Sequence, residues 1–422
     1  MSNQAAASLP HSDLVYEWNR HNRPNASFPN DVELVDETLR DGLQSPSVSS
    51  PCMEDRMQLV RYMADLGIDL VNIGLPGAGG VHYKNSLSLA SLIVGEDLNI
   101  RMSAAARTVV ADIAPIVEIS QKLGAQISVY TFIGTSPIRQ TVENWSLQSI
   151  MQHIEEAIRF AVREGLDTVQ VLEDTTRTPP EVLKEVFTCG IAAGASTICL
   201  CDTVGYADPD GIDALIGFTN AIIRKSGRKV KIDFHGHNDR GLATVNAIQA
   251  ARSGAHRIHG CAVGIGERVG NCAMEQILVN LALDGHGSRN LSSLHAYAKL
   301  ASEMTQYPIP VSAPVVGSDA FRTATGVHAA AIAKAEARAD KWLADRVYSS
   351  VPASLIGRKQ VIEIGNMSGK SNVRHWLHEY GIPIEDDLVS EILDYAKKHY
   401  RLLTVKEIDE VIYKYRNKIV GQ

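Results

Sequence analysis

The sequence predicts an α/β protein, a closed (β/α)8 TIM barrel with a mostly helical C-terminal appendage. Three observations predict this fold. Between residues 32 and 283, eight short runs rich in β-branched residues alternate with stretches whose apolar residues recur at helical spacing. The runs recur roughly every thirty residues, the length of a βα unit, so their strands should pair in parallel. Polar residues follow each run, which is typical of barrel strands whose ends converge on one site.

The predicted strands follow one another at residues 32–35, 69–73, 100–104, 126–130, 168–172, 197–201, 229–234 and 257–263. An open, doubly wound sheet is the alternative arrangement of such units. That fold usually has a glycine-rich phosphate-binding turn after its first strand, and the segment LVDETLRDG at residues 34–42 is not one. The pattern therefore favours the closed barrel.

The chain divides into three predicted parts. We expect a polar N-terminal arm at residues 1–30, the barrel at 31–285 and the helical appendage at 286–422. Within the appendage, a helix and a proline-bearing linker come first, and another helix starts at about Val327. The last roughly forty residues contain two amphipathic helices. Such a region could cover the mouth of the barrel or pair two subunits.

Composition excludes several classes of function. The 422 residues include 41 basic and 48 acidic side chains, and this net charge of −7 argues against a nucleic-acid partner. The six cysteines are scattered without a CxxC pair, so we expect them to be reduced. The sequence has neither a secretory leader pattern nor roughly 18 consecutive apolar residues, so we expect a cytoplasmic protein without a membrane partner.

The sharpest chemical signal is the segment HGHND at residues 235–239, after the seventh predicted strand. In extended backbone, side chains two residues apart point to the same face, so His235 and His237 can bind one cation together. Imidazole pairs suit zinc, manganese, iron or cobalt better than calcium. An HxH pair is common by chance, but its place at the end of a barrel strand favours a metal site.

A catalytic cation also needs oxygen ligands and an open position. Asp41, after the first strand, can supply a carboxylate oxygen, and Asn271, in the loop after the eighth strand, can supply an amide oxygen. The first, seventh and eighth strands are neighbours in a closed barrel, so these side chains can meet the two histidines. Taken singly, Asp41 would be interpreted as a loop cap and Asn271 as a turn residue beside Gly270.

Five segments occur in an order that resembles a known family. They are DETLRDGLQ (36–44), EDTTRTP (173–179), CDTVGYADP (201–209), HGHNDRGLATVNAIQAARSGA (235–255) and GIGERVGNCAMEQIL (264–278). The chain resembles the DRE-TIM metallolyases. Within them it is most similar to the acetyl-CoA-dependent, Claisen-condensing branch of 2-isopropylmalate, homocitrate and citramalate synthases. The resemblance covers Val32 to Leu283 and extends more weakly into the appendage.

The resemblance implies a divalent metal held by Asp41, His235, His237 and Asn271. Manganese, magnesium, zinc and cobalt all fit mixed nitrogen and oxygen ligands. It also implies that Arg40 contacts a 2-oxo acid and its developing oxyanion, and that Thr203 binds the substrate carboxylate. We expect Gln44 and Asn72 to take part in substrate binding as well.

The implied reaction agrees with the chemistry of these residues. A 2-oxo acid can chelate a metal through its ketone and carboxylate oxygens, and the planar, permanently charged Arg40 suits a developing alkoxide. The methyl group of acetyl-CoA must first lose a proton, and Glu173, after the fifth strand, is the best base in the barrel. In the family a histidine from the C-terminal region acts across a dimer, and His328 in TGVHAAA matches its position. We therefore expect a homodimer whose C-terminal region contributes to the neighbour's site.

The sequence departs from the family pattern at three places. Leu43 replaces the usual glutamate, Asn72 stands where an acidic residue is expected, and two alanines follow His328 in place of aspartate and glycine. Two alternatives therefore stay open. One is an acyl-CoA lyase of the 3-hydroxy-3-methylglutaryl-CoA type, which shares the leucine, although the loop GERVGN resembles the synthases. The other is a non-catalytic barrel that keeps the metal and binds a partner.

Three smaller expectations complete the interpretation. Overall motif likeness favours 2-isopropylmalate chemistry, with homocitrate and citramalate synthesis as alternatives. An alkyl pocket would involve Leu75, Pro76, Tyr130, Thr131 and Gln170. The segment GNMSGKS at 365–371 is one residue short of a phosphate-binding loop, so it is not expected to hydrolyse a nucleotide. In the family this region lies in the helical appendage, and the resemblance therefore implies that Gly369 and Lys370 are turn and surface residues. We expect no leucine-binding regulatory domain after the helical segment.

Overall fold

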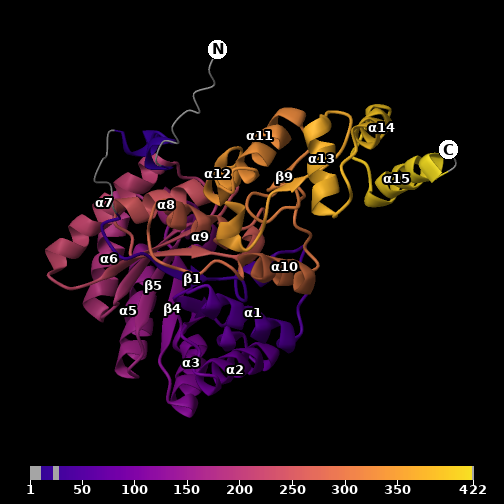
Figure 1. Ribbon diagram of the computed structural model, residues 1–422. Coiled ribbons are helices and arrows are strands. Elements are labelled where there is room, and N and C mark those ends of the chain that lie inside the picture. The colour runs from indigo at the N-terminus through magenta and orange to yellow at the C-terminus, as the bar shows by residue number, and fades with distance from the viewer. Residues whose placement is uncertain (1–10, 22–27, 421–422) are drawn as a thin grey trace.

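The computed structural model describes residues 11–21 and 28–420. The eight predicted strands are present and close into a parallel barrel in chain order, with β8 pairing back to β1 (Figure 1). The predicted fold class is confirmed. The strands are β1 Glu33–Asp36, β2 Leu70–Asn72, β3 Arg101–Arg107, β4 Ile127–Gly134, β5 Thr168–Glu173, β6 Thr197–Asp202, β7 Lys231–Gly236 and β8 Arg257–Gly260.

Helices follow the strands and cover the outside of the barrel (Figure 1). A side-chain cap begins some of them: Ser146 accepts a hydrogen bond from the Ser149 N–H at the start of α5, and Asp208 accepts one from Gly211 at the start of α7. The helices are α1 Met53–Asp65, α2 Gly80–Gly95, α3 Val110–Leu123, α4 Pro137–Glu143, α5 Leu147–Arg163, α6 Pro180–Ala193, α7 Pro209–Ser226, α8 Ala243–Ser253 and α9 Met274–Leu283.

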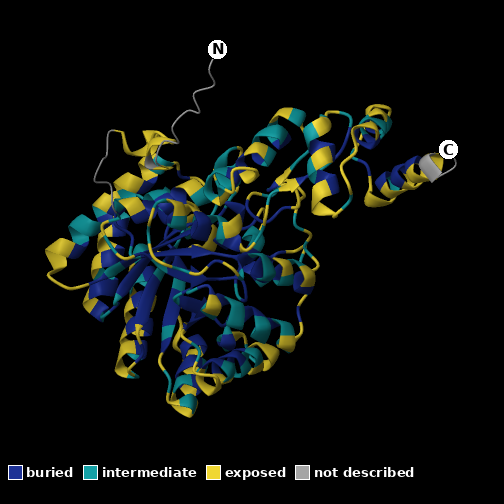
Figure 2. Ribbon diagram, in the orientation of Figure 1, coloured by how far each residue is buried: buried dark blue, intermediate teal, exposed yellow. Residues whose placement is uncertain are grey.

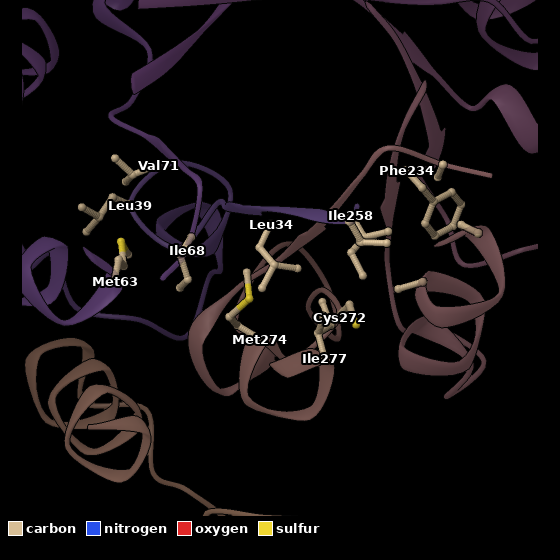
Figure 3. Close-up of a cluster of buried hydrophobic side chains, with 14 of the residues drawn as sticks. Leu34, Leu39, Met63, Ile68, Val71, Phe234, Ile258, Cys272, Met274 and Ile277 are labelled. Atoms are coloured by element: carbon tan, nitrogen blue, oxygen red, sulfur yellow. The ribbon is translucent and has the colours of Figure 1, made fainter. Parts of the chain in front are cut away.

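The hydrophobic core lies between the strands and this layer of helices. Leu34 and Ile258 are paired across β1 and β8, and Figure 3 shows both pointing toward Met274 and Ile277 of α9. Successive strand residues point to opposite faces, so the next pair, Val35 and His259, faces the inside of the barrel. Figure 2 shows the result, with buried strands at the centre and exposed residues mostly on the outer faces of the helices.

The eighth strand is shorter than predicted. We predicted a strand over 257–263, but β8 ends at Gly260, and Val263 adopts a left-handed conformation with φ 49°. Cys261 is still extended, and its backbone N–H donates to Cys272 O at 2.9 Å. The 3-10 turn Ala262–Gly264 follows directly and prevents the strand from continuing to Val263.

The C-terminal region is mostly helical, as predicted, and also contains a two-stranded sheet that was not predicted. Its helices are α10 Leu294–Thr305, α11 Gly326–Glu336, α12 Lys341–Arg346, α13 Lys370–Glu379, α14 Asp386–Lys397 and α15 Val405–Val420. The strands β9 Arg322–Thr323 and β10 Val361–Ile362 have two residues each, too few for a visible period. Helices α13 to α15 project away from the barrel around a core of their own (Figure 1).

The predicted N-terminal arm falls partly outside the described residues, at 1–10 and 22–27. In the described part, His11 stacks on Trp342 of α12 with ring centroids 4.4 Å apart, and Arg20 donates to the backbone oxygen of Asp284. The side chains of Tyr16 and Trp18 in this segment are exposed. Within residues 11–21 and 28–420, no helix combines the length and the apolar character needed to span a membrane.

Candidate metal and substrate site

Asp41, His235 and His237 meet at the carboxyl ends of the barrel strands. The Asp41 Oδ2 atom lies 3.4 Å from His235 Nε2 and 3.5 Å from His237 Nε2, and the two imidazole nitrogens are 3.3 Å apart. All three side chains are buried. One carboxylate oxygen thus faces two ring nitrogens across a gap that suits a shared cation.

Local backbone structure brings these three residues together. His235 is the next-to-last residue of β7, which ends at Gly236. The N–H of His237 donates to Asp202 O of β6, and this hydrogen bond keeps the chain extended just beyond β7. Asp41 sits directly before the short 3-10 turn Gly42–Gln44, at the end of the β1 loop. In the closed barrel only β8 separates β1 from β7, so both loops border the same end of the barrel.

Asn271 reaches the same place through a glycine-containing loop. It forms an antiparallel bridge with His237, and its side-chain amide donates to Ile265 O. Gly266 has φ 154°, and a Cβ there would lie 2.1 Å from Asn271 Nδ2. At Gly270, with φ 95°, a Cβ would lie 1.9 Å from Gly264 O. These two positions require glycine, because a side chain would displace Asn271.

The donor set fits a divalent cation. Asp41 Oδ2 and Asn271 Oδ1 are buried, and neither has a hydrogen-bond partner among the described residues. Leaving a buried carboxylate or amide oxygen without a partner is costly, and a metal would satisfy both. Two imidazoles, a carboxylate and an amide also leave positions for a bidentate guest.

The electrostatics keep these groups in the protonation state that binds metal. Burial, followed by the neighbouring His235, lowers the pKa of His237 to about 4, so this imidazole is neutral at pH 7. Burial alone would raise the pKa of Asp41, but Arg40 and His235 outweigh it and hold the pKa well below its usual range. A neutral imidazole and an ionised carboxylate are the forms that coordinate a cation.

Arg40 is fixed next to this cluster by a buried glutamate. Its Nε and Nη2 atoms lie 2.9 and 2.8 Å from Glu37 Oε2, and its Nη1 atom lies 3.6 Å from Asp41 Oδ1. Burial would raise the pKa of Glu37, but Arg40 and His259 lower it to about 2. The guanidinium thus stands at the cavity wall beside the proposed metal position.

A cavity at this end of the barrel brings most of the predicted site residues together. Its lining includes Arg40, Asp41, Gln44, Glu173, Thr203, His235 and His237. Burial raises the pKa of Glu173, although Arg139, with Nη2 3.7 Å from Glu173 Oε2, opposes the shift. Thr203 accepts a hydrogen bond from the N–H of Asp174, and Gln44 lies 3.5 Å from Arg40 Nη1. A raised pKa at a cavity wall suits a group that exchanges protons.

Three predicted site residues, Asn72, Asn271 and His328, are not among the described lining residues of this cavity. Asn72 is fully buried; its side chain donates to Glu37 Oε2 at 3.0 Å and accepts from the Gly74 N–H. His328 lies on α11, where its ring stacks on Tyr348 with centroids 3.9 Å apart. Neither Asn72 nor His328 faces the metal cluster of its own chain.

Of the five residues predicted for an alkyl pocket, some line the cavity and others do not. Leu75 and Tyr130 line the cavity, whereas Pro76, Thr131 and Gln170 are not among its described lining residues. The Gln170 amide instead donates to Val186 O of α6. Leu43, one of the departures from the family pattern, packs against the hydrophobic core.

Sequence reasoning missed Glu37 and His259, which also line the cavity. Both are buried, and His259 Nδ1 lies 3.3 Å from Glu37 Oε1. Strand alternation could have found His259. Arg257 and His259 are both polar and two residues apart in a run whose intervening Ile258 packs outside the barrel.

Comparisons with known proteins identify the family of this chain. Residues 31–301 match the HMGL-like family model. The putative (R)-citramalate synthase of Methanopyrus kandleri is 30% identical over 90% of this chain and 71% of that protein. Two Methanocaldococcus jannaschii proteins are similar: a 2-isopropylmalate synthase (30% identity, 90% of this chain, 69% of that protein) and a homocitrate synthase (29%, 92% and 92%).

Among solved structures, the HMG-CoA lyase of Bacillus subtilis shares the fold. It has a TM-score of 0.55 and 22% identity over 67% of this chain and 96% of that one. The family match covers the whole barrel, from the strand before Arg40 to the loop that carries Asn271 and beyond. The chain therefore belongs to the HMGL-like, or DRE-TIM, family.

Proposed function

We propose that this protein condenses acetyl-CoA with a small 2-oxo acid in a divalent-metal-dependent Claisen reaction and then hydrolyses the thioester, which yields an alkylmalate and CoA. It would be an acyltransferase that converts the acyl group into alkyl on transfer. One observation carries the proposal: the Asp41, His235 and His237 cluster opens into the same cavity as Arg40 and Glu173. The names of the relatives, all synthases, support it.

The metal would be held by Asp41, His235, His237 and Asn271, and it supplies Lewis-acid polarisation of the oxo acid's ketone. Arg40 binds the oxo acid and stabilises the negative charge that grows on its ketone oxygen. Thr203, with Gln44, binds the substrate carboxylate. Glu173 removes a proton from the acetyl methyl group, because its raised pKa makes it a stronger base than an ordinary carboxylate.

The cavity wall favours an oxo acid with an alkyl side chain. Leu75, Ala105, Phe132 and Val171 form an apolar part of the lining. An alkyl group gains free energy when it is buried against these apolar side chains, whereas a second carboxylate placed there would lose its hydration without a polar partner among them. We therefore favour 2-isopropylmalate-type synthesis over homocitrate synthesis, with citramalate synthesis as the alternative for a smaller oxo acid.

We further propose a cytoplasmic homodimer in which His328 serves the neighbouring subunit's site. This arrangement gives a role to a histidine that does not line the described cavity of its own chain. The division into an arm (1–30), a barrel (31–285) and a helical region (286–422) remains part of the same proposal.

An assay of CoA-thiol release tests the proposed function. The purified protein is supplied with acetyl-CoA and Mn²⁺ and with 2-oxoisovalerate, 2-oxobutyrate, pyruvate or 2-oxoglutarate, with and without a chelator. We expect release that depends on an alkyl 2-oxo acid and stops when the metal is removed. Release without an oxo acid, or in the presence of chelator, contradicts the proposal. Acetyl-CoA formation from a 3-hydroxy-3-methyl acyl-CoA, without condensation, indicates the lyase instead.

The role of Glu173 leads to a first prediction. Glu173→Gln keeps the size of the side chain and removes the base, so kcat should fall by about 10²- to 10⁴-fold. Binding of the oxo acid to the Mn²⁺-loaded protein, measured by calorimetry, should change little. Glu181→Gln, an exposed position on α6, is the matched control. A variant with near-normal turnover would remove Glu173 from the mechanism.

A further inference from the structure

We propose that Glu37 is the positioning residue for Arg40, the buried carboxylate that aims the guanidinium at the proposed oxo acid. Its immediate partner is Asn72, which we expected to bind substrate and which instead holds Glu37. The inference deepens the proposed function and rests on it for its catalytic meaning. Its geometric part, that Glu37 fixes Arg40, stands separately.

Three neighbouring residues contact the carboxylate of Glu37. Its Oε2 atom faces Arg40 Nε and Nη2 at 2.9 and 2.8 Å and also accepts from Asn72 Nδ2 at 3.0 Å. Its Oε1 atom lies 3.3 Å from His259 Nδ1. The side chain of Glu37 is 1% exposed, so water does not compete for these contacts. A carboxylate held from three sides is a rigid anchor.

The anchor leaves one edge of Arg40 available. Nε and Nη2 are engaged by Glu37, while Nη1 points toward Asp41 and Gln44, at 3.6 and 3.5 Å. These are longer contacts that a ligand oxygen could replace. A guanidinium donates in a fixed plane, so fixing two of its nitrogens also fixes the direction of the third.

Asn72 completes the anchor without adding charge. Its Oδ1 atom accepts from the Gly74 N–H at 3.1 Å, which orients the amide so that Nδ2 donates to Glu37. Since both Glu37 and Asn72 are buried, a carboxylate at 72 would face Glu37 directly and add another anion to the two, Glu37 and Asp41, that already lie near Arg40. Here Glu37 supplies the carboxylate that Arg40 Nε and Nη2 contact, and Asn72 of β2 supplies a neutral donor.

The anchor is backed by a chain of charges across the barrel interior. His259 stands between two carboxylates, with Nδ1 3.3 Å from Glu37 and Nε2 3.4 Å from Asp233. Asp233 in turn accepts from Arg257 Nε at 2.6 Å and from the Tyr130 hydroxyl at 2.8 Å. Alternating charges from Arg257 to Arg40 hold each member in place, so Glu37 cannot follow Arg40 if a ligand pulls on it.

The test compares three variants. Glu37→Gln removes the negative charge of the side chain at 37. The double variant Glu37→Gln/Asn72→Asp restores one negative charge at position 72, the hydrogen-bond partner of residue 37, and keeps the number of heavy atoms unchanged. Asp112→Asn is the matched control. It removes a similarly buried carboxylate from Arg107, at the end of β3 but outside the described lining of the cavity.

The first readout does not need catalysis. Phenylglyoxal modification of Arg40 and Arg107 is followed by peptide mass spectrometry in the full chain. We expect Arg40 to react severalfold faster in Glu37→Gln and to slow again in the double variant. In Asp112→Asn only Arg107 should accelerate. An unchanged Arg40 rate in a folded Glu37→Gln protein overturns the proposal.

The second readout separates positioning from folding. Glu37→Gln should lower kcat by about 10²-fold, the cost of misplacing a reacting group by about 1 Å, while Mn²⁺ affinity stays within a few-fold of the original. The double variant should recover at least part of kcat. If the original protein condenses no oxo acid, the proposed function fails, but the modification rates still decide whether Glu37 fixes Arg40. Should Glu37→Gln not fold, fast Arg40 modification in a folded double variant overturns the proposal and slow modification supports it.

Discussion

At the scale of single residues, the site depends on one carboxylate oxygen that faces two imidazoles. Asp41 Oδ2 is buried, lies 3.4 to 3.5 Å from the nitrogens of His235 and His237, and has no hydrogen-bond partner among the described residues. Such an arrangement is costly for the protein alone, because the carboxylate has been desolvated without a donor. A cation recovers that cost, so metal affinity should depend on this atom.

Asp41→Asn therefore leads to a second prediction. The change keeps the shape of the side chain and removes its charge, so Mn²⁺ affinity should fall by at least about tenfold. Calorimetric titration of the metal-free protein measures it. Asp112→Asn, which alters another buried carboxylate, should bind Mn²⁺ like the original protein. Equal affinities in the two variants would place the metal elsewhere.

At the scale of elements, the first turn of α9 carries a buried acid outside the site. Glu275 accepts a hydrogen bond from the Val263 N–H, and burial raises its pKa to about 7. The folded protein therefore binds this proton more tightly than the unfolded chain does, whose pKa is about 4.5. Stability from Glu275 is present below pH 4.5 and is lost as pH rises toward 7.

A third prediction follows from that sign. The glutamine in Glu275→Gln cannot ionise, so this variant does not lose stability as pH rises, whereas the original protein does. The free energy of unfolding of the variant minus that of the original protein should therefore increase between pH 5 and pH 8, by on the order of 2 kcal/mol. Urea unfolding at the two pH values measures the difference. Asp394→Asn on α14, at the surface, should show no such trend. A difference independent of pH would mean that Glu275 is ionised throughout.

The helices α13 to α15 form an element group with its own hydrophobic core. Trp376, Leu377 and Ile392 are buried there, in a cluster separate from the barrel core. Ile392→Ala should destabilise this group by about 2–5 kcal/mol, through lost burial and a cavity. Hydrogen exchange should speed up in α13–α15 and not in the barrel strands. Ile216→Ala on α7 should do the reverse, and uniform acceleration in both variants would contradict separate cores.

At the scale of the whole molecule, the described metal cluster belongs to the barrel and His328 belongs to the appendage. A homodimer that exchanges the appendage would unite them, since a two-fold axis places the same element beside both sites. Mixing inactive Asp41→Asn and His328→Ala proteins, with subunit exchange, should then restore CoA-thiol release. Activity that stays absent in confirmed mixed dimers would mean that each site uses only its own chain. Neither variant incubated alone should recover.

Much of this architecture follows from local pattern. The β-branched runs and the helical periodicity predict each barrel strand to within a few residues, because side-chain alternation and burial act over a few neighbours. The strand ends differ more: β3 and β4 continue three and four residues beyond their predicted ends, and β8 stops three residues before its predicted end, ahead of the turn Ala262–Gly264. The strands β9 and β10 have a two-residue pairing that is decided entirely by distant contacts.

For the site, the sequence by itself determined which residue types can act: His235, His237 and Asp41 as ligands, Arg40 and Glu173 as charged groups at strand ends. Only the tertiary structure decided that Asn72 donates to Glu37, and that His259 stands between Glu37 and Asp233. The physical reason is that hydrogen-bond partners inside a barrel come from different strands. Their distances depend on closure and register, which no single stretch of sequence contains.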